Sequence, residues 1–299
     1  MTPDAPHKQS ICAVIVTHNP DDGFAARAAV TAGMVGGVVV VDNGSAGGPP
    51  DVPGAGSIAN AENLGIAAAL NQGVGWAIEH GFAWVLTLDD DSTPAPGMIE
   101  HLRAAWDACG FRDRVGVVAA NFFDPVAGAD FYATRGAARP WIEVVTAITS
   151  GSLMPVAAIR AAGGFREDYF IDSVDNEYCL RLRRKGYRVI ISTRRDMTHV
   201  LGGQRSVARA GSVRVTASDY GPARRYYMTR NRLVLAAEYM RTDGAWVVRE
   251  LVRALLEVAA MLLLEKRRPA KLRAIALGLW HGMIGRMGPA PDSLAGGRA

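Results

Sequence analysis

The sequence predicts an α/β fold with a mainly parallel central sheet, followed by a helical extension. Two features of the sequence indicate this fold. In the first 120 residues, short continuous apolar runs alternate with stretches of helical periodicity, which is the pattern of repeated strand–helix units. From about residue 226 to residue 287 the pattern is helical, with interruptions at Thr242-Asp243-Gly244 and at Pro269.

The length and composition fit one large domain with an appendage. A chain of 299 residues is short for two full domains. Its hydrophobic content of 49% and charged content of 21% are ordinary for a protein with a packed core. We expect a flexible N-terminus at residues 1–9, an α/β domain at 10–225, a helical region at 226–287 and a flexible tail at 288–299.

Each strand and helix of the α/β domain is expected from its own pattern. Ile11–Thr17 is a continuous apolar, β-branched run, as in a strand buried on both faces. The other expected strands are Val38–Asp42, Ser57–Asn60, Trp84–Leu88, Val115–Ala120 and Tyr187–Ser192, with Trp141–Thr149 extended. The expected helices are Phe24–Val35, Gly65–His80 with Asn63 as its cap, Pro96–Ala108, Pro155–Ala162 and Asp175–Lys185.

Cysteine usage and the apolar runs predict a cytoplasmic protein. The three cysteines are scattered without a CxxC pair, so no structural disulfide is expected, which indicates a reducing compartment. The polar N-terminus MTPDAPHKQS does not resemble a signal peptide. Near the C-terminus the longest apolar run, Val258–Leu264, is far too short to span a bilayer.

The acidic triplet Asp89-Asp90-Asp91 follows the predicted strand Trp84–Leu88. In an extended segment residues i and i+2 point the same way, so Asp89 and Asp91 share one side. Two such carboxylates repel each other unless a cation or hydrogen-bond donors neutralise them. Mg²⁺ or Mn²⁺, held by one or two carboxylates and by substrate phosphates, meets that need. The alternative is an acidic turn in which Asp91 or Ser92 caps the next helix.

A second acidic cluster lies in the segment Phe170–Arg181, FIDSVDNEYCLR. Asp172, Asp175 and Glu177 surround the start of a predicted helix. An ionised carboxylate there could serve as a general base for an attacking hydroxyl group. Acidic residues in a first turn also complement the helix dipole, so both interpretations stay open. A lone histidine such as His199 is more often structural than a ligand.

Seven motifs occur in an order that resembles the family 2 inverting glycosyltransferases of the GT-A fold. They are AVIVTHNP (13–20), VVVDNGS (39–45), ENLGIAAALNQG (62–73), LTLDDDS (86–92), SGSLMP (150–155), GGFREDYFIDSVDNEYCLR (163–181) and YYMTRNR (226–232). The resemblance covers about residues 10–235. FIDSVDNEYCLR together with DDDS is most similar to the bacterial rhamnosyltransferases, which commonly carry Gln at the position of Asp90.

The resemblance implies a GT-A catalytic domain at residues 10–225 and a role for each matched residue. Asp89 and Asp91 match the DxD motif and, with His199, the contacts of a Mg²⁺ or Mn²⁺ ion. Asp175 matches the catalytic base. Arg230 falls where the family often places a phosphate-facing basic group. Residues that match the lining of the nucleotide-sugar pocket are Thr17, Asn19, Asp42, Asn63, Gly65, Asp89, Asp90 and Arg230.

The expected activity is the transfer of a sugar, with L-rhamnose from dTDP-rhamnose as the best fit, to a lipid-linked or polysaccharide acceptor of a surface glycan. Inversion would follow from direct displacement at the anomeric carbon. The alternatives are a galactofuranosyl or other hexosyl transferase, or a nucleotidyltransferase. The last would usually carry a Gly-rich, basic loop near the first strand, and VTHNPDDG has no such loop. A non-catalytic sugar-binding protein would have lost Asp91 or Asp175.

The helical region carries many basic residues between apolar ones, and the net charge of the chain is +4. This pattern suits a helix that lies on an anionic membrane, at the inner face of the cell membrane. Packing on the catalytic domain or on a second subunit, as in a homo-oligomer, is the equal alternative. No nucleic-acid partner is expected. The basic residues of the region include Arg249, Arg253, Lys266, Arg267, Arg268, Lys271 and Arg273.

Overall fold

The structure is a computed structural model that describes residues 3–134, 136–200, 205–210 and 213–295. Its contacts divide the chain into two compact units. The sheet unit consists of Met1–Arg166 and Asp175–Val200, and the helical unit consists of Glu167–Val174 and Leu201–Ala299. The ends expected to be flexible include a short 3₁₀ turn at Lys8–Ser10 and helix α8 at Asp292–Ala295, while residues 1–2 and 296–299 lie outside the described residues.

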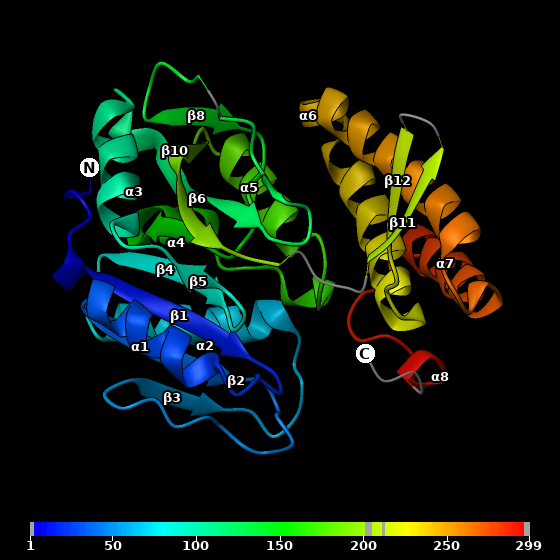
Figure 1. The fold of residues 1–299 in the computed structure, drawn as a ribbon, viewed down its shortest axis with the longest axis horizontal. Helices are drawn as coiled ribbons and strands as arrows, with labels where there is room; N and C mark the ends of the chain where they lie inside the picture. Colours follow the sequence, from blue (N-terminus) through cyan, green and yellow to red (C-terminus); the bar gives the residue numbers. More distant parts are fainter. Residues whose placement is uncertain (1–2, 135, 201–204, 211–212, 296–299) are drawn as a thin grey trace. The chain divides into compact units, whose positions relative to one another are not determined.

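A mixed central sheet forms the sheet unit, with strand order β3-β2-β1-β4-β9-β6-β10-β5 (Figure 1). Its first four strands, and the β6–β10 pair, are parallel, whereas β9 is antiparallel to both β4 and β6. The short strands β7 and β8 pair with β6 and β10. The bounds are β1 Ile11–Thr17, β2 Gly37–Asp42, β3 Gly56–Ala59, β4 Trp84–Asp89, β5 Thr93–Pro94, β6 Val115–Asp124, β7 Ala129–Asp130, β8 Trp141–Val144, β9 Ser152–Pro155 and β10 Arg188–Thr198.

Helices pack on this sheet through apolar and small side chains. All seven residues of β1 are buried, as expected of a strand covered on both faces. The helix α2 packs on β1 and β2, and Gly73 permits this close approach, because a Cβ there would lie 2.3 Å from the side chain of Val14. The helices of the unit are α1 Phe24–Met34, α2 Ile66–Glu79, α3 Met98–Ala108, α4 Val156–Ala162 and α5 Val174–Arg184.

The predicted strands and helices of the first half are confirmed to within a few residues. The expectation that Asn63 caps α2 is wrong: Gly65 is the N-cap residue, with φ of 87°, and Asn63 instead accepts a hydrogen bond from its backbone N–H. Several features were not expected. The run at β9, inside SGSLMP, was not predicted as a strand, and β10 extends to Thr198, beyond the predicted end at Ser192.

Three helical arms make up most of the helical unit. Helix α6 (Pro222–Leu264) is broken at Asp243, whose φ of −131° and ψ of 39° are not helical. Its arms run antiparallel, because Arg232 pairs with Glu257 at 2.6 Å and Arg225 pairs with Glu265. The third arm is α7 (Arg268–Met283), which packs on α6. The predicted interruptions near residues 243 and 269 are therefore confirmed, and an antiparallel hairpin of β11 (Arg205–Ala210) and β12 (Val213–Ser218) precedes α6.

Two buried side chains of α6 hold the segment Glu167–Val174. Asn231 donates to the carbonyl oxygens of residues 169, 171 and 172 at 2.8–3.0 Å. Arg230 donates to those of residues 168 and 169 at 3.2 and 3.1 Å, and also to that of Gly288. The segment needs such support, since three of its non-glycine residues have φ between 62° and 64°, a conformation that costs about 1–3 kcal/mol at each.

Replacing Arg230 by alanine should destabilise the helical unit by about 3 kcal/mol or more, because buried carbonyl groups would lose their donors. Thermal unfolding would show this as a clear fall in the melting temperature. Arg241→Ala is the matched control, since Arg241 is an exposed arginine of the same helix. Equal melting temperatures for the two variants would contradict a structural role for Arg230.

In the described part of the chain, no helix is both long and apolar enough to cross a membrane. The longest, α6, has 43 residues, but charged residues recur along it from Arg224 to Glu257.

Candidate metal and nucleotide site

The carboxyl ends of three parallel neighbours, β2, β1 and β4, meet at one edge of the sheet. Thr17 at the end of β1 lies opposite Asp42 at the end of β2. Asp89 at the end of β4 lies beside Val16 of β1. Ligands of such sheets bind beyond the carboxyl ends of the strands. The fold therefore brings together, at one edge, polar residues that are up to about 70 positions apart in the sequence.

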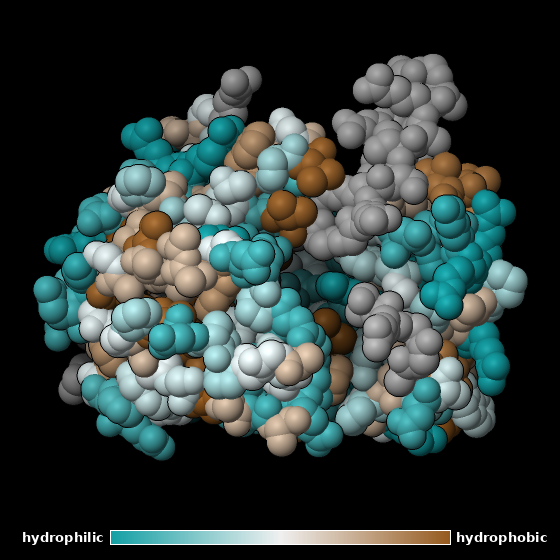
Figure 2. Space-filling model, turned by 60° about the horizontal axis from the view of Figure 1, so that its bottom comes forward, coloured by the Kyte–Doolittle hydropathy of each residue, from teal (hydrophilic) through white to brown (hydrophobic). Residues whose placement is uncertain are grey.

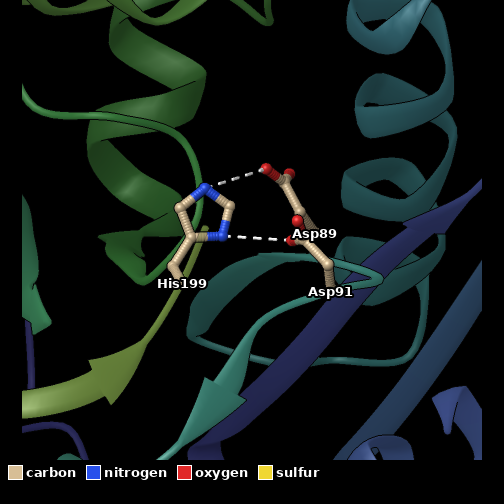
Figure 3. A group of neighbouring side chains, drawn as sticks. All are labelled: Asp89, Asp91 and His199. Atoms are coloured by element: carbon tan, nitrogen blue, oxygen red, sulfur yellow. Dashed lines mark ion pairs between the residues drawn. The ribbon is translucent and has the colours of Figure 1, made fainter. Parts of the chain in front are cut away.

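Asp89, Asp91 and His199 form a cluster at this edge (Figure 3). The Nδ1 atom of His199 lies 3.1 Å from Oδ1 of Asp91, and its Nε2 atom lies 3.9 Å from Oδ2 of Asp89. One ligand atom from each residue lies within 4.8 Å of the other two. The two aspartate side chains are 42% and 45% exposed, whereas that of His199 is 7% exposed. The cluster thus has a buried nitrogen and two accessible carboxylates.

Strand pairing places His199 beside the acidic turn. The short strand β5, just after Asp91, pairs antiparallel with the end of β10. His199 follows β10 directly, and its backbone N–H donates to the carbonyl of Phe123 at 3.2 Å. Ser92 lies 3.0 Å from Nδ1 of the ring and 2.7 Å from the hydroxyl of Ser150. Hydrogen bonds to the backbone N–H and to the ring of His199 therefore fix the position of the imidazole.

The charges of the cluster favour a cation. Burial opposes protonation of His199, but the hydrogen bond with Asp91 and the negative charges of Asp89 and Asp91 outweigh it, so the pKa of His199 is raised. The same groups that favour a proton on the ring would also attract a divalent cation. Two carboxylate oxygens and one imidazole nitrogen are a donor set that divalent metals accept. Asp89, Asp91 and His199 therefore provide ligand atoms that fit a divalent metal ion.

Thr17 and Asp42 form a buried polar pair next to this cluster. The hydroxyl of Thr17 donates to Oδ1 of Asp42 at 3.2 Å. Asp42 also accepts from the backbone N–H of Ser45 at 3.2 Å and from its hydroxyl. Asn19 joins them through Ser45, whose hydroxyl accepts from the Asn19 backbone N–H at 2.7 Å. Three predicted pocket residues, from the ends of β1 and β2 and from the loop after β1, are thus brought together.

Asn43, which the sequence analysis did not single out as a site residue, connects this pair to the loop before α2. Its Oδ1 accepts from Asn60 and from the backbone N–H of Leu64, and its Nδ2 donates to Asn63 at 3.1 Å. Asn63 in turn accepts from Gly65 N–H at 2.9 Å. The signal that could have identified Asn43 is its position directly after a buried strand.

Asp90 points to the loop after β1, as the alternation of an extended segment predicts. Its carboxylate accepts from the backbone N–H of His18 at 3.4 Å, and its carbonyl oxygen accepts from Arg27 at 2.8 Å. Burial and the neighbouring Asp91 charge outweigh the hydrogen bond from His18, so the pKa of Asp90 is raised. Asp90 therefore links the acidic turn to the β1 loop.

Asp175 lies in the first turn of α5, half buried, with Oδ1 accepting from the N–H of Asn176 at 2.8 Å. The neighbouring acidic residues have other partners. Glu177 is buried and forms a salt bridge with Arg181 at 3.0 Å, and Asp172, in the helical unit, pairs with Arg224 at 3.2 Å. Of the three acidic residues, Glu177 and Asp172 thus have evident structural roles.

Arg230 does not lie as a phosphate-facing residue should. It is fully buried in the helical unit, and its five guanidinium N–H groups meet acceptors on Asn231, Tyr226, Gly288, Asp168 and Tyr169. Arg232 pairs with Glu257. The resemblance to the YYMTRNR motif located the segment but not the partners of its arginines, which depend on tertiary packing.

Comparisons with known proteins agree with this geometry. Residues 38–158 match the model of the family described as Glycosyl transferase family 2, and this stretch contains Asp42, Asp89 and Asp91. The dTDP-rhamnosyl transferase RfbF of Shigella flexneri is 28% identical over 141 residues, which are 47% of this chain and 46% of that protein. The match thus spans about half the length of the relative.

Among solved structures, the crystal structure of S. aureus TarS matches with a TM-score of 0.53 and 15% identity, covering 83% of this chain and 43% of TarS. At that identity the likeness shows the fold alone. It confirms the predicted GT-A fold, with its mostly parallel sheet and a C-terminal helical region. Residues 38–158, which contribute Asp42, Asp89 and Asp91 to the strand-end site, therefore match a glycosyl transferase family 2 domain.

Proposed function

We propose that this chain is a metal-dependent glycosyltransferase that takes a sugar from a nucleoside diphosphate donor with inversion. The observation that supports this most directly is the convergence of Asp89, Asp91 and His199 at the end of β4. They lie next to the buried Thr17–Asp42 pair. A cation site beside polar side chains is what a diphosphate joined to a nucleoside requires.

Some residues of the site would bind the nucleotide sugar, and others would hold the metal ion. Asp42, with its position fixed by Thr17 and Ser45, would accept hydrogen bonds from the nucleobase, while Asn63 and Gly65 would lie by the nucleotide and sugar. Asp91 and His199, with Asp89, would hold Mg²⁺ or Mn²⁺. When bound, that ion supplies a Lewis acid for the charge that develops on the leaving diphosphate. The imidazole ligand favours Mn²⁺ over Mg²⁺.

Asp175 is proposed as the base that accepts the proton of the acceptor hydroxyl. Asp175 is partly exposed at the start of α5, in contrast to the buried Glu177. Base assistance of this kind is worth about 10²–10⁴-fold in rate. Attack of the hydroxyl oxygen on the anomeric carbon, opposite the leaving diphosphate, breaks the glycosidic C–O bond and inverts the configuration.

The sugar is proposed to be L-rhamnose from dTDP-rhamnose, on a lipid-linked or polysaccharide acceptor of a surface glycan. The similarity to a dTDP-rhamnosyl transferase supports this choice of donor. We further propose that the protein works in the cytoplasm.

Release of nucleotide tests the function. Purified protein with acceptor-containing membrane extract should release dTDP from dTDP-rhamnose when Mn²⁺ or Mg²⁺ is present and lose that activity with EDTA. UDP-galactose and UDP-galactofuranose serve as competing donors, and release of pyrophosphate from a nucleoside triphosphate and a sugar phosphate would indicate a nucleotidyltransferase. Turnover of a UDP-sugar in place of dTDP-rhamnose would overturn the choice of sugar, and full activity in EDTA would overturn the metal requirement.

A further inference from the structure

Exposed large hydrophobic side chains concentrate in the helical unit. Within the described residues, twelve of the sixteen lie between Met240 and Ile284. An isolated exposed Leu or Val is common on soluble proteins, but a contiguous row indicates a surface that binds something. Hydrophobic residues, in brown, also reach the surface among hydrophilic ones in the view of Figure 2.

The second arm of α6, residues 244–264, carries the longest such row. Val248, Val252 and Leu255 are 53%, 50% and 71% exposed, and Leu262 and Leu263 are 39% and 69% exposed. Spacings of three and four residues place them along one side of the helix, with Leu256 (65% exposed) beside them. An arm of 21 residues is about 30 Å long. We call this row the apolar stripe.

Positive charges border the apolar stripe, and the carboxylates of the same arm form ion pairs. Arg249 and Arg253 are exposed next to the stripe, and Lys266, Arg267 and Arg268 are exposed at its end. The acidic side chains of the arm are already paired: Glu250 is 13% exposed and pairs with Arg253 at 3.1 Å, and Glu257 is 32% exposed and pairs with Arg232. Glu265, directly after the arm, is buried against Arg225 and Lys271.

We propose that the apolar stripe of α6 docks on an anionic lipid surface, with its leucine and valine side chains at the level of the headgroups and its basic border on the lipid phosphates. A helix with an apolar side, a basic border and exposed leucines is the kind that lies in a membrane interface. Each basic residue near an anionic leaflet raises binding about fivefold.

Charge favours lipid over a second copy of the chain as the occupant. In a symmetric dimer built on this stripe, the Arg249 and Arg253 groups of the two copies would approach each other, and the carboxylates of the arm, Glu250 and Glu257, already pair with Arg253 and Arg232 of the same chain. Like charges across such an interface cost free energy. The proposal concerns the helical unit only and does not depend on the proposed glycosyltransferase activity.

Vesicle binding of the full chain tests this proposal. Sedimentation should show stronger binding to vesicles containing about one-third phosphatidylglycerol than to pure phosphatidylcholine vesicles. The double variant Leu255→Glu/Leu263→Glu should bind the anionic vesicles at least about tenfold more weakly. Val30→Glu/Val126→Glu is the matched control, because these valines are 47% and 51% exposed on the sheet unit and the variant adds the same charge.

A second double variant allows the proposal to be tested even if Leu255→Glu/Leu263→Glu does not fold. Arg249→Gln/Arg253→Gln should weaken binding to anionic vesicles by about 25-fold and leave binding to neutral vesicles unchanged. Wild-type levels of binding by both double variants would overturn the proposal. So would a wild-type dimer in solution that ignores vesicles and becomes a monomer in Leu255→Glu/Leu263→Glu, since the stripe would then be a subunit interface. All variants should bind the nucleotide-sugar donor as tightly as the wild-type protein does. A wild-type protein that does not bind the donor would count against the proposed function and not against the lipid proposal.

Discussion

Replacing Asp91 by alanine should reduce metal-dependent turnover at least about 100-fold, which corresponds to about 2.7 kcal/mol in the activation free energy. Asp91 supplies the carboxylate closest to His199, at 3.1 Å. The side chain is 45% exposed at a strand end, so the fold should stay intact. The melting temperature should change little, because the removed repulsion with Asp89 offsets the lost hydrogen bond with His199. Initial rates over a Mn²⁺ titration measure the effect.

Asp113→Ala is the control for Asp91→Ala, since Asp113 is an exposed aspartate in the 3₁₀ turn Arg112–Arg114 of the same unit. It should retain wild-type turnover. Near wild-type activity of Asp91→Ala at ordinary Mn²⁺ concentrations would remove the strand-end metal site from the account.

Asp175→Asn should lower turnover by about 10² or more with little change in melting temperature or donor affinity. Asparagine keeps the size of the side chain and its Oδ1 acceptor for the N–H of Asn176, but it cannot accept a proton. Were Asp175 only a helix-start carboxylate, the change would cost about 0.3–1 kcal/mol of stability and leave activity in place. Turnover, melting temperature and donor affinity, measured together, separate these two cases.

The neighbouring carboxylates differ in their value as controls for Asp175. Asp172→Asn weakens a partly buried ion pair with Arg224 and should leave turnover largely intact. Glu177→Gln breaks a buried pair with Arg181, whose guanidinium also holds the carbonyls of Ala162 and Gly164. That variant should mainly lose stability. Similar modest losses of turnover in all three variants would argue against Asp175 as the base.

Local patterns predicted the parallel part of the sheet well, because each strand there is a continuous buried apolar run between helices. They did not predict β9. This strand has only four residues, Ser152–Pro155, and starts with a serine. Its pairing with β4 and β6 depends on contacts that are distant in the sequence. The same applies to the extension of β10, which pairs with the short β5.

The site shows the same division between local and distant information. The i, i+2 spacing of Asp89 and Asp91 was enough to predict that they share a side, and only the family resemblance added His199, 108 positions after Asp91 in the sequence. Ser150, which lies 2.7 Å from Ser92 and accepts from Asp89 N–H, is part of the SGSLMP motif. Arg230 was assigned to a phosphate by its motif, whereas its partners are buried carbonyls.

Binding of Mn²⁺ in the presence of dTDP tests the central claim most directly, namely that Asp89, Asp91 and His199 form a metal site used with a nucleotide. Free Mn²⁺ would be followed by its electron paramagnetic resonance signal during titration of the protein. The account predicts that the wild-type protein binds a single Mn²⁺, that dTDP tightens this binding, and that Asp91→Ala weakens it by at least about 100-fold. Equal Mn²⁺ binding by the wild-type and Asp91→Ala proteins, with no effect of dTDP, would contradict it.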